Sequence, residues 1–244
     1  MWIVVPFSRP ENAALVLENV RRQRGCSVRL AVVENGRAVG RWPYAADLLL
    51  TSAPSPGAAK NEALEAIRQR GGGLWTTFDD DDYYGPDHVA ELQREAVRAD
   101  VIGRYIHWVR FSNGLYRFNG ERANRYADSV CGATITARAE DSVPFSDARL
   151  GEDVQWCKQM RDRGARIYAC SDRQHVYRRL GNDHAWSAHP VIVRRQLGAS
   201  FYYGDAPDST CHAACGSSVY VPVPSDEEVF KVIETCSQRT SSPE

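Results

Sequence analysis

Short apolar runs alternate with segments of helical periodicity over the first hundred residues. Runs 3–7, 28–33, 47–51 and 74–78 have the length and composition of buried strands. Segments 13–20 and 58–70 place apolar residues on one face of a helix, and Pro86 opens a further helix with Val89, Leu92 and Ala96 facing inward. This alternation through short links predicts an α/β domain with a mostly parallel sheet that helices cover.

The residues after the first strand and those beyond position 100 carry other local signals. Ser8-Arg9-Pro10-Glu11 matches a capping box with an early proline, which predicts the start of the first helix. Segments 101–111 and 115–118 flank Ser112-Asn113-Gly114, which predicts a β-hairpin. Residues 132–137 favour β-structure, 151–163 a helix and 166–170 a strand. We expect one domain over 1–224, and over 225–244 a C-terminal helix with a polar, disordered tail.

Composition narrows the function classes. The chain has 244 residues and a formal net charge of −1, so it has no global electrostatic signature for nucleic acid or anionic membrane. A local basic patch around Arg178-Arg179 and Arg194-Arg195 remains open. No apolar stretch approaches the length of a membrane span, and the N-terminus lacks the features of a secretion signal.

The cysteines favour a reducing compartment. Their number, seven, is odd and their spacing shows no disulfide framework, so we expect free thiols and a cytoplasmic location. Cys211, His212 and Cys215, with Cys236, have spacing that a zinc site could use, although ordinary buried or free cysteines are the favoured interpretation.

Four consecutive aspartates, Asp79 to Asp82, follow the strand 74–78 directly. Adjacent like charges repel, so such a run costs folding free energy unless a cation neutralises it. Mg²⁺ and Mn²⁺ prefer carboxylate oxygens and commonly bind phosphate oxygens as well. The carboxyl ends of strands are also where open α/β sheets bind ligands. The run therefore predicts a divalent metal site, with an acidic surface loop as the alternative.

Three further stretches make this run more specific when they are taken with it in order. With the aspartate run included, the four stretches are, in chain order, VVPFSRPE at 4–11, GAAKNEAL at 57–64, FDDDDY at 78–83 and GEDV at 151–154. Together they resemble family 2-type glycosyltransferases, in which the third stretch contains the DxD signature and the fourth the acidic pair with the catalytic base. The resemblance implies the GT-A (nucleotide-diphospho-sugar transferase) fold, a Rossmann-like, mostly parallel central sheet covered by helices, with a small β-rich acceptor part.

The same resemblance implies an activity. We expect a metal-dependent, inverting transfer of a sugar from a nucleotide-diphosphate sugar, with a UDP-sugar favoured, to an acceptor hydroxyl. Mn²⁺ or Mg²⁺ would stabilise the charge that develops on the leaving diphosphate. Asp81 would bind the metal and Asp79 would lie near the ribose. Asp80 and Asp82 are substitutes within the run, and Asp80 would point to solvent or to a neighbouring backbone N–H.

Residues of the other stretches would complete the donor site. Pro6, Phe7 and Arg9 would line the pocket, and Glu34 would accept the imide N–H of uracil or else be a solvated turn residue. Lys60 would meet the diphosphate or be solvated, and Arg178 or Arg179 would fork onto the phosphates. His175, which we prefer, or His184 would help to bind the metal or the diphosphate.

The acidic pair would act on the acceptor side. Asp153 would be the general base that takes the proton of the attacking hydroxyl, and Glu152 would orient the acceptor. The alternative is that both simply complement the dipole of a helix start. Tyr105, His107 and Trp108, with residues 128–133, would form the acceptor pocket, although Trp108 is favoured as a core residue.

Two other function classes compete with this interpretation. One is a non-catalytic nucleotide-sugar-binding protein, against which the presence of both acidic motifs argues. The other is a metal-dependent phosphoesterase or nucleotidyltransferase, which would need further carboxylates or a glycine-rich first loop that the chain lacks. The acceptor stays open among a glycan, a protein, a small molecule and a modified nucleic acid, and so does the oligomeric state.

Overall fold

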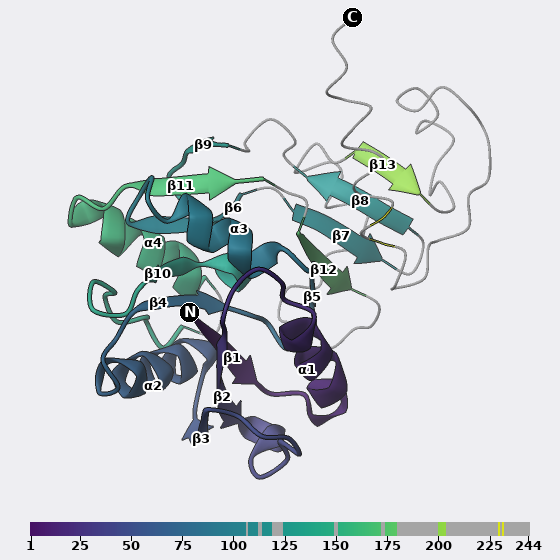
Figure 1. Cartoon of the computed structure of the whole chain (residues 1–244), viewed down its shortest axis with the longest axis vertical. Helices are drawn as coiled ribbons and strands as arrows, with labels where there is room; N and C mark the ends of the chain where they lie inside the picture. The colour runs from purple at the N-terminus through teal and green to yellow at the C-terminus, as the bar shows by residue number, and fades with distance from the viewer. Residues whose placement is uncertain are drawn as a thin grey trace, which may run out of the picture.

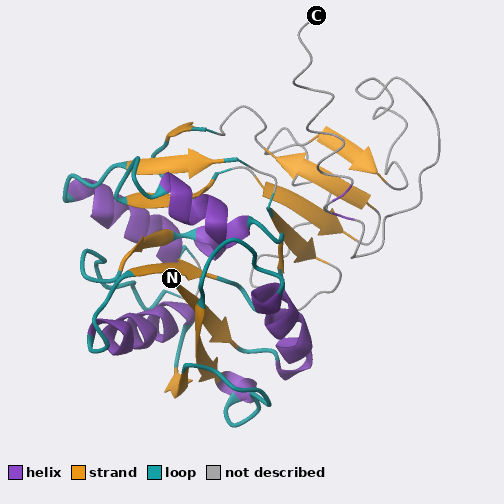
Figure 2. Cartoon of the chain, viewed as in Figure 1, coloured by secondary structure: helices purple, strands orange, loops and turns teal. Residues whose placement is uncertain are grey.

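The computed structural model describes residues 1–105, 107–111, 114–118, 124–148, 151–171, 174–179, 200–203, 229 and 231. Within them, strands form two neighbouring sheets (Figure 1), and helices pack on the larger sheet (Figure 2). The strands are β1 (Trp2–Phe7), β2 (Arg29–Asn35), β3 (Leu48–Ala53), β4 (Leu74–Thr77), β5 (Tyr83–Tyr84), β6 (Val101–Arg104), β7 (His107–Phe111), β8 (Gly114–Phe118), β9 (Arg125–Tyr126), β10 (Thr136–Arg138), β11 (Ile167–Cys170), β12 (His175–Arg179) and β13 (Ser200–Tyr203). The helices are α1 (Ala13–Arg21), α2 (Pro56–Arg68), α3 (His88–Glu95) and α4 (Glu152–Asp162), with the 3₁₀ turns η1 (Pro10–Asn12), η2 (Gly36–Ala38) and η3 (Gly132–Thr134).

The larger sheet has the strand order β3-β2-β1-β4-β10-β6-β11-β9. Strand β1 lies parallel between β2 and β4, β3 is parallel to β2, and β11 is parallel to β6. Strand β10 is antiparallel to both β4 and β6, and β9 is antiparallel to β11. The predicted α/β class with a mostly parallel, helix-covered sheet is therefore confirmed.

Side-chain alternation along β1 explains why helices cover both faces. Trp2 and Val4 share an apolar cluster with residues of α2 and α4, whereas Ile3 and Val5 share another with residues of α1 and α3. Successive side chains of a strand point to opposite faces, so an apolar run buries both. The sheet thus becomes a rigid central layer whose strand ends can carry a site.

The smaller sheet has the order β13-β8-β7-β12-β5. Strands β7 and β8 pair antiparallel with Phe111 opposite Gly114, so the predicted hairpin is confirmed, although residues 112 and 113 lie outside the described part. The single run predicted over 101–111 is instead two strands, β6 and β7, in different sheets. Apolar content does not record such a change of sheet.

Two further local predictions need correction. Ser8 does not cap α1: its hydroxyl and backbone N–H donate to Asp80, and α1 begins at Ala13 after η1. A hydrogen bond donated to a carboxylate is stronger than the bond between neutral groups that a serine cap forms by accepting a backbone N–H. The β-structure predicted over 132–137 begins later than expected, because residues 132–134 form η3 and the strand β10 spans Thr136–Arg138.

Of the predicted C-terminal helix and tail only Val229 and Lys231 are described, and the candidate zinc residues lie outside the described part. Across the described residues, no helix combines the length and apolarity that crossing a membrane requires.

Candidate active site

The candidate site lies at one edge of the larger sheet, beyond the carboxyl ends of β1, β2 and β4. Phe7 pairs with Glu34, and Val4 with Thr77, so these parallel strands end close together. The aspartate run forms the turn from β4 to the short strand β5. Ligands bind at this kind of edge in open α/β sheets.

Three carboxylates converge in this turn. Asp79, Asp81 and Asp82 each offer an oxygen within 4.8 Å of the others, close enough for one cation. Opposite ligands of an octahedral Mg²⁺ lie about 4.2 Å apart, so only a small contraction separates this arrangement from a coordination shell. Asp82 is fully buried and Asp81 nearly so.

Asp80 turns the other way and holds the loop after β1. Its Oδ2 accepts the backbone N–H of Ser8 at 2.6 Å and of Arg9 at 2.9 Å, and its Oδ1 pairs with the Arg9 guanidinium at 2.5 Å. Asp80 is only 2% exposed. Of the two predicted orientations, solvent is therefore wrong and the neighbouring backbone N–H groups are confirmed.

Two guanidinium groups flank the cluster, Arg9 from the loop after β1 and Arg179 from the end of β12. Arg9 reaches Asp81 at 3.3 Å as well as Asp80, and Arg179 lies 3.2 Å from Asp82 and 3.8 Å from Asp81. Four carboxylates against these two cations leave two formal negative charges, which matches one divalent ion. The donor set and the charge therefore both fit Mn²⁺ or Mg²⁺.

The surroundings make this charge costly. Burial raises the pKa of Asp82 to about 7, against the opposing effect of Arg179. Burial, followed by the charge of Asp82, raises the pKa of Asp79 well above its ordinary value. Protonation therefore competes with ionisation in the isolated cluster, and a bound cation would favour the ionised form.

The predicted acidic pair begins α4 and faces the same region. Glu152 accepts from Lys60, whose Nζ lies 2.9 Å from its Oε1, and Lys60 is only 2% exposed, so a solvated lysine is wrong. Asp153 is half-buried and packs on Gly132, where a Cβ would lie 2.3 Å from its Oδ2.

Cys131 connects the two acidic motifs. Its Sγ lies 2.6 Å from the hydroxyl of Tyr177, and burial, with a contribution from the charges of Asp79 and Asp82, raises the pKa of the thiol to about 12. Because its neighbour Gly132 touches Asp153, residues 131–132 bring the aspartate cluster and the pair on α4 into one site.

Comparison with solved structures identifies the architecture. S. aureus TarS 1-349 in complex with UDP-GlcNAc matches with a TM-score of 0.57 and 18% identity, over 77% of this chain and 61% of that one. The mannosyltransferase PcManGT from Pyrobaculum calidifontis, in complex with GDP-Man and Mn²⁺, matches with a TM-score of 0.56 and 16% identity, over 80% and 60%. The chain has the GT-A fold. Neither a scan against known protein families nor a search of curated proteins found a match.

The GT-A fold of this chain spans only part of those proteins. It covers about three fifths of the two structures above and 36% of a longer TarS structure, which matches with a TM-score of 0.52 and 15% identity. At this level of identity the likeness defines the fold, and the chemistry has to be argued from this chain's own residues.

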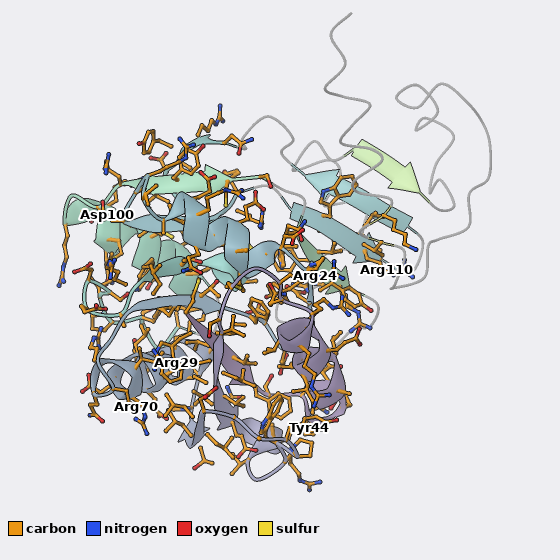
Figure 3. All side chains as sticks on the ribbon, in the orientation of Figure 1. Arg24, Arg29, Tyr44, Arg70, Asp100 and Arg110 are labelled. Carbon is orange, nitrogen blue, oxygen red and sulfur yellow. The ribbon has the colours of Figure 1, made fainter. Side chains whose placement is uncertain are left out.

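Glu34, which the sequence predicts near the nucleobase, takes backbone partners in the structure. Glu34 is 1% exposed, so the solvated-turn alternative is wrong, and its carboxylate accepts the backbone N–H groups of residues 40, 41 and 42 at 2.9, 2.9 and 2.6 Å. It thereby holds the loop that packs Trp42 edge-on against buried Phe7, at 5.0 Å between ring centroids. Trp42 also lies edge-on to Tyr44, at 5.6 Å between centroids. Figure 3 labels Tyr44. Pro6 is buried in β1 opposite Val33. Contact of Pro6, Phe7 or Glu34 with a nucleotide stays a prediction.

Strand β12 supplies the basic side of the site. Nε2 of His175 lies 3.1 Å from Oδ2 of Asp82, and burial lowers the pKa of His175 well below its ordinary value, so the neutral ring orients this carboxylate. Arg178 places its guanidinium over the ring of Tyr83 and donates its backbone N–H to Asp82. Its neighbour Arg179 reaches the cluster instead. A metal-ligand role for His175 stays a prediction, and His184 lies outside the described residues.

The sequence alone did not decide between Arg178 and Arg179, and it assigned no role to Tyr177. The signal was available in the period of two along β12, which puts His175, Tyr177 and Arg179 on one side. Among the residues expected at the acceptor side, Trp108 is 1% exposed in an apolar cluster with Tyr83 and Leu115, so its favoured assignment to the core is confirmed.

Proposed function

We propose that this chain is a metal-dependent glycosyltransferase that moves a sugar from a nucleotide-diphosphate sugar, with a UDP-sugar favoured, to an acceptor hydroxyl. The observation that carries the proposal is the convergence of Asp79, Asp81 and Asp82 at the ligand-binding edge of a GT-A sheet. The structural neighbours support it, because TarS 1-349 is in complex with UDP-GlcNAc or UDP, and the mannosyltransferase PcManGT is in complex with GDP-Man and Mn²⁺.

The three converging carboxylates would hold Mn²⁺ or Mg²⁺. When bound, such an ion supplies a Lewis acid that stabilises the negative charge of the departing diphosphate. Arg9 and Arg179 would bind the same phosphates, because a guanidinium presents paired donors that match phosphate oxygens. Both already lie within 4 Å of Asp81, so they need little movement to share a phosphate beside it.

Asp153 is the proposed general base. It lies half-buried at the start of α4, and the absence of a side chain at Gly132 leaves it space. A hydroxyl of the acceptor would donate its proton to Asp153 as its oxygen attacks the anomeric carbon. Attack from the side opposite the diphosphate, without a covalent enzyme intermediate, gives inversion.

The decisive experiment is thermal unfolding with a panel of nucleoside diphosphates and nucleotide sugars, with and without Mn²⁺. We expect one nucleotide to raise the melting temperature only when Mn²⁺ is present, because selective binding to the native state stabilises it. Asp81→Asn should remove this shift, and Asp153→Asn should retain it but lose release of the nucleotide from its sugar.

The exposed Asp87, which caps no amide with its side chain, provides the matched control Asp87→Asn. It should behave as wild type in both assays. Absence of any metal-dependent nucleotide shift would reject the transferase, and hydrolysis of a simple phosphoester would favour a phosphoesterase. Normal turnover in Asp153→Asn would reject only the assignment of the base.

A further inference from the structure

The beginning of α2 lies directly against the segment that leads into α4. A Cβ at Gly57 would lie 2.1 Å from the backbone oxygen of Ser146, so only glycine permits this approach without movement. Ser55 caps α2 through Ala58 N–H, and its hydroxyl also contacts the carboxylate of Asp147 at 3.1 Å. Helix α2 and residues 145–147 are therefore fixed to one another at backbone distance.

Asn61 fastens the same segment with its side-chain amide. Its Nδ2 donates to the carbonyl of Phe145 at 2.9 Å, and its Oδ1 accepts the N–H of Phe145 at 2.8 Å. One side chain thus satisfies both backbone polar groups of one residue, as a neighbouring strand would. The loss of this pair would leave two backbone groups without their partners.

Lys60 extends the attachment to α4 itself. Its ammonium lies 2.9 Å from Oε1 of Glu152 and 5.0 Å from the centroid of the Phe145 ring. Glu152 is the first residue of α4, and the preceding Gly151 has φ +79° and no side chain to cap the helix. The first turn of α4 is therefore held by a residue of another helix, Lys60 of α2, through the buried ion pair with Glu152.

We propose that Lys60, together with Gly57 and Asn61, positions the Glu152–Asp153 pair and does not bind the donor diphosphate. This inference rests on the proposed function, since it assigns Asp153 as the group being positioned. The carboxylate of Glu152 pairs with the ammonium of Lys60, and the ring of Phe145 contacts the same ammonium through a cation–π interaction, so both fix its position. The GAAKN segment acts as a clamp that sets where α4 begins relative to the sheet edge.

The test compares wild type with Lys60→Met and Asn61→Leu. Probes are UDP with Mn²⁺, titrated by calorimetry, and UDP-GlcNAc with Mn²⁺, followed by release of UDP. For both variants we expect the Kd of UDP to stay within about twofold of wild type, whereas loss of a phosphate ligand would weaken it roughly tenfold or more. KM for UDP-GlcNAc should hold while kcat falls by roughly tenfold or more, because a misplaced catalytic group loses its near-attack geometry.

Several results would overturn the inference. It fails if Lys60→Met loses UDP affinity while keeping its melting temperature, or if it turns over as wild type does. Should Lys60→Met not fold because Glu152 is left without its partner, Lys60→Met/Glu152→Gln removes both charges of the pair. Retained UDP affinity in that double variant supports the inference, and lost affinity rejects it.

A second measurement separates this inference from the proposed function. Amide hydrogen exchange over residues 143–156 should accelerate in Lys60→Met and Asn61→Leu without any nucleotide present. Unchanged exchange would overturn the clamp even if the enzyme binds and cleaves UDP-GlcNAc. If wild type binds no nucleotide but exchange accelerates, the proposed function fails while the attachment of α4 to α2 stands.

Discussion

At the scale of single residues, the candidate site is a problem of charge balance. Asp81 contacts both Arg9 and Arg179, so it is the point where cations from two segments meet. The arginines lower the repulsion within the aspartate run but leave a negative excess. A divalent ion and a diphosphate added together would leave each charged group with partners of opposite sign.

Arg179 and Arg178 provide a matched test of this balance. Arg179→Gln should weaken binding of UDP with Mn²⁺ by roughly tenfold or more, because a charge-assisted contact with phosphate is lost. Arg178→Gln should weaken it less, since that guanidinium lies over Tyr83. Calorimetric titration at fixed Mn²⁺ measures both. A larger loss in Arg178→Gln would mean that the donor reaches the other face of β12.

At the scale of elements, the loop after β1 is held by a side chain from a different strand connection. Asp80 accepts hydrogen bonds from two backbone N–H groups and forms an ion pair with Arg9. These contacts take the place of the serine cap that the sequence predicts for α1. The four aspartates therefore divide into two groups. Asp80 fixes the loop after β1, and Asp79, Asp81 and Asp82 bring their carboxylate oxygens together at the candidate metal site.

Asp80→Ala tests the loop attachment. Two buried N–H groups would lose their acceptor, so we expect the free energy of unfolding to fall by about 2 kcal/mol or more, although relief of repulsion from Asp81 offsets part of the loss. Urea denaturation gives this value. Asp87→Ala, at an exposed position, should stay within about 0.5 kcal/mol of wild type. An Asp80→Ala variant as stable as wild type would show that repulsion dominates at this position.

At the scale of the whole molecule, the helix α3 and strands β6 and β12 meet around buried polar groups between the two sheets. Arg104 is fully buried and pairs with Glu91 at 2.8 Å. His88 is fully buried as well, and its Nδ1 lies 3.0 Å from the carbonyl of Gln174. These contacts make the junction sensitive to protonation, because its groups cannot be hydrated in the folded state.

Burial, followed by the charge of Arg104, lowers the pKa of His88 well below the ordinary 6.5. Below pH 6.5 the unfolded chain therefore binds a proton that the folded chain excludes, and the free energy of unfolding falls by about 1.4 kcal/mol per pH unit for this residue. Urea denaturation from pH 8 to pH 5 measures the slope. His88→Asn should be less stable at pH 8 yet show a shallower slope, and an unchanged slope would assign the effect to other groups.

Much of the architecture follows from the chain alone. Apolar runs and helical periodicity predict the strands and helices of the first hundred residues, because burial on both faces of a parallel sheet leaves a direct imprint on composition. Asp79–Asp82, Lys60 and Glu152–Asp153 also stand out, because charged residues beside apolar strands need partners. Their convergence on one edge agrees with the resemblance to GT-A glycosyltransferases.

Only the tertiary structure decides which partner each charge takes. Glu34 binds the loop at 40–42, Lys60 meets Glu152, and Asp80 takes the amides of Ser8 and Arg9. The second and third of these pairs join residues far apart in sequence, so no local pattern encodes them. A buried charge takes the nearest partner that the packed chain provides, and that distance exists only once the strands and helices are in place.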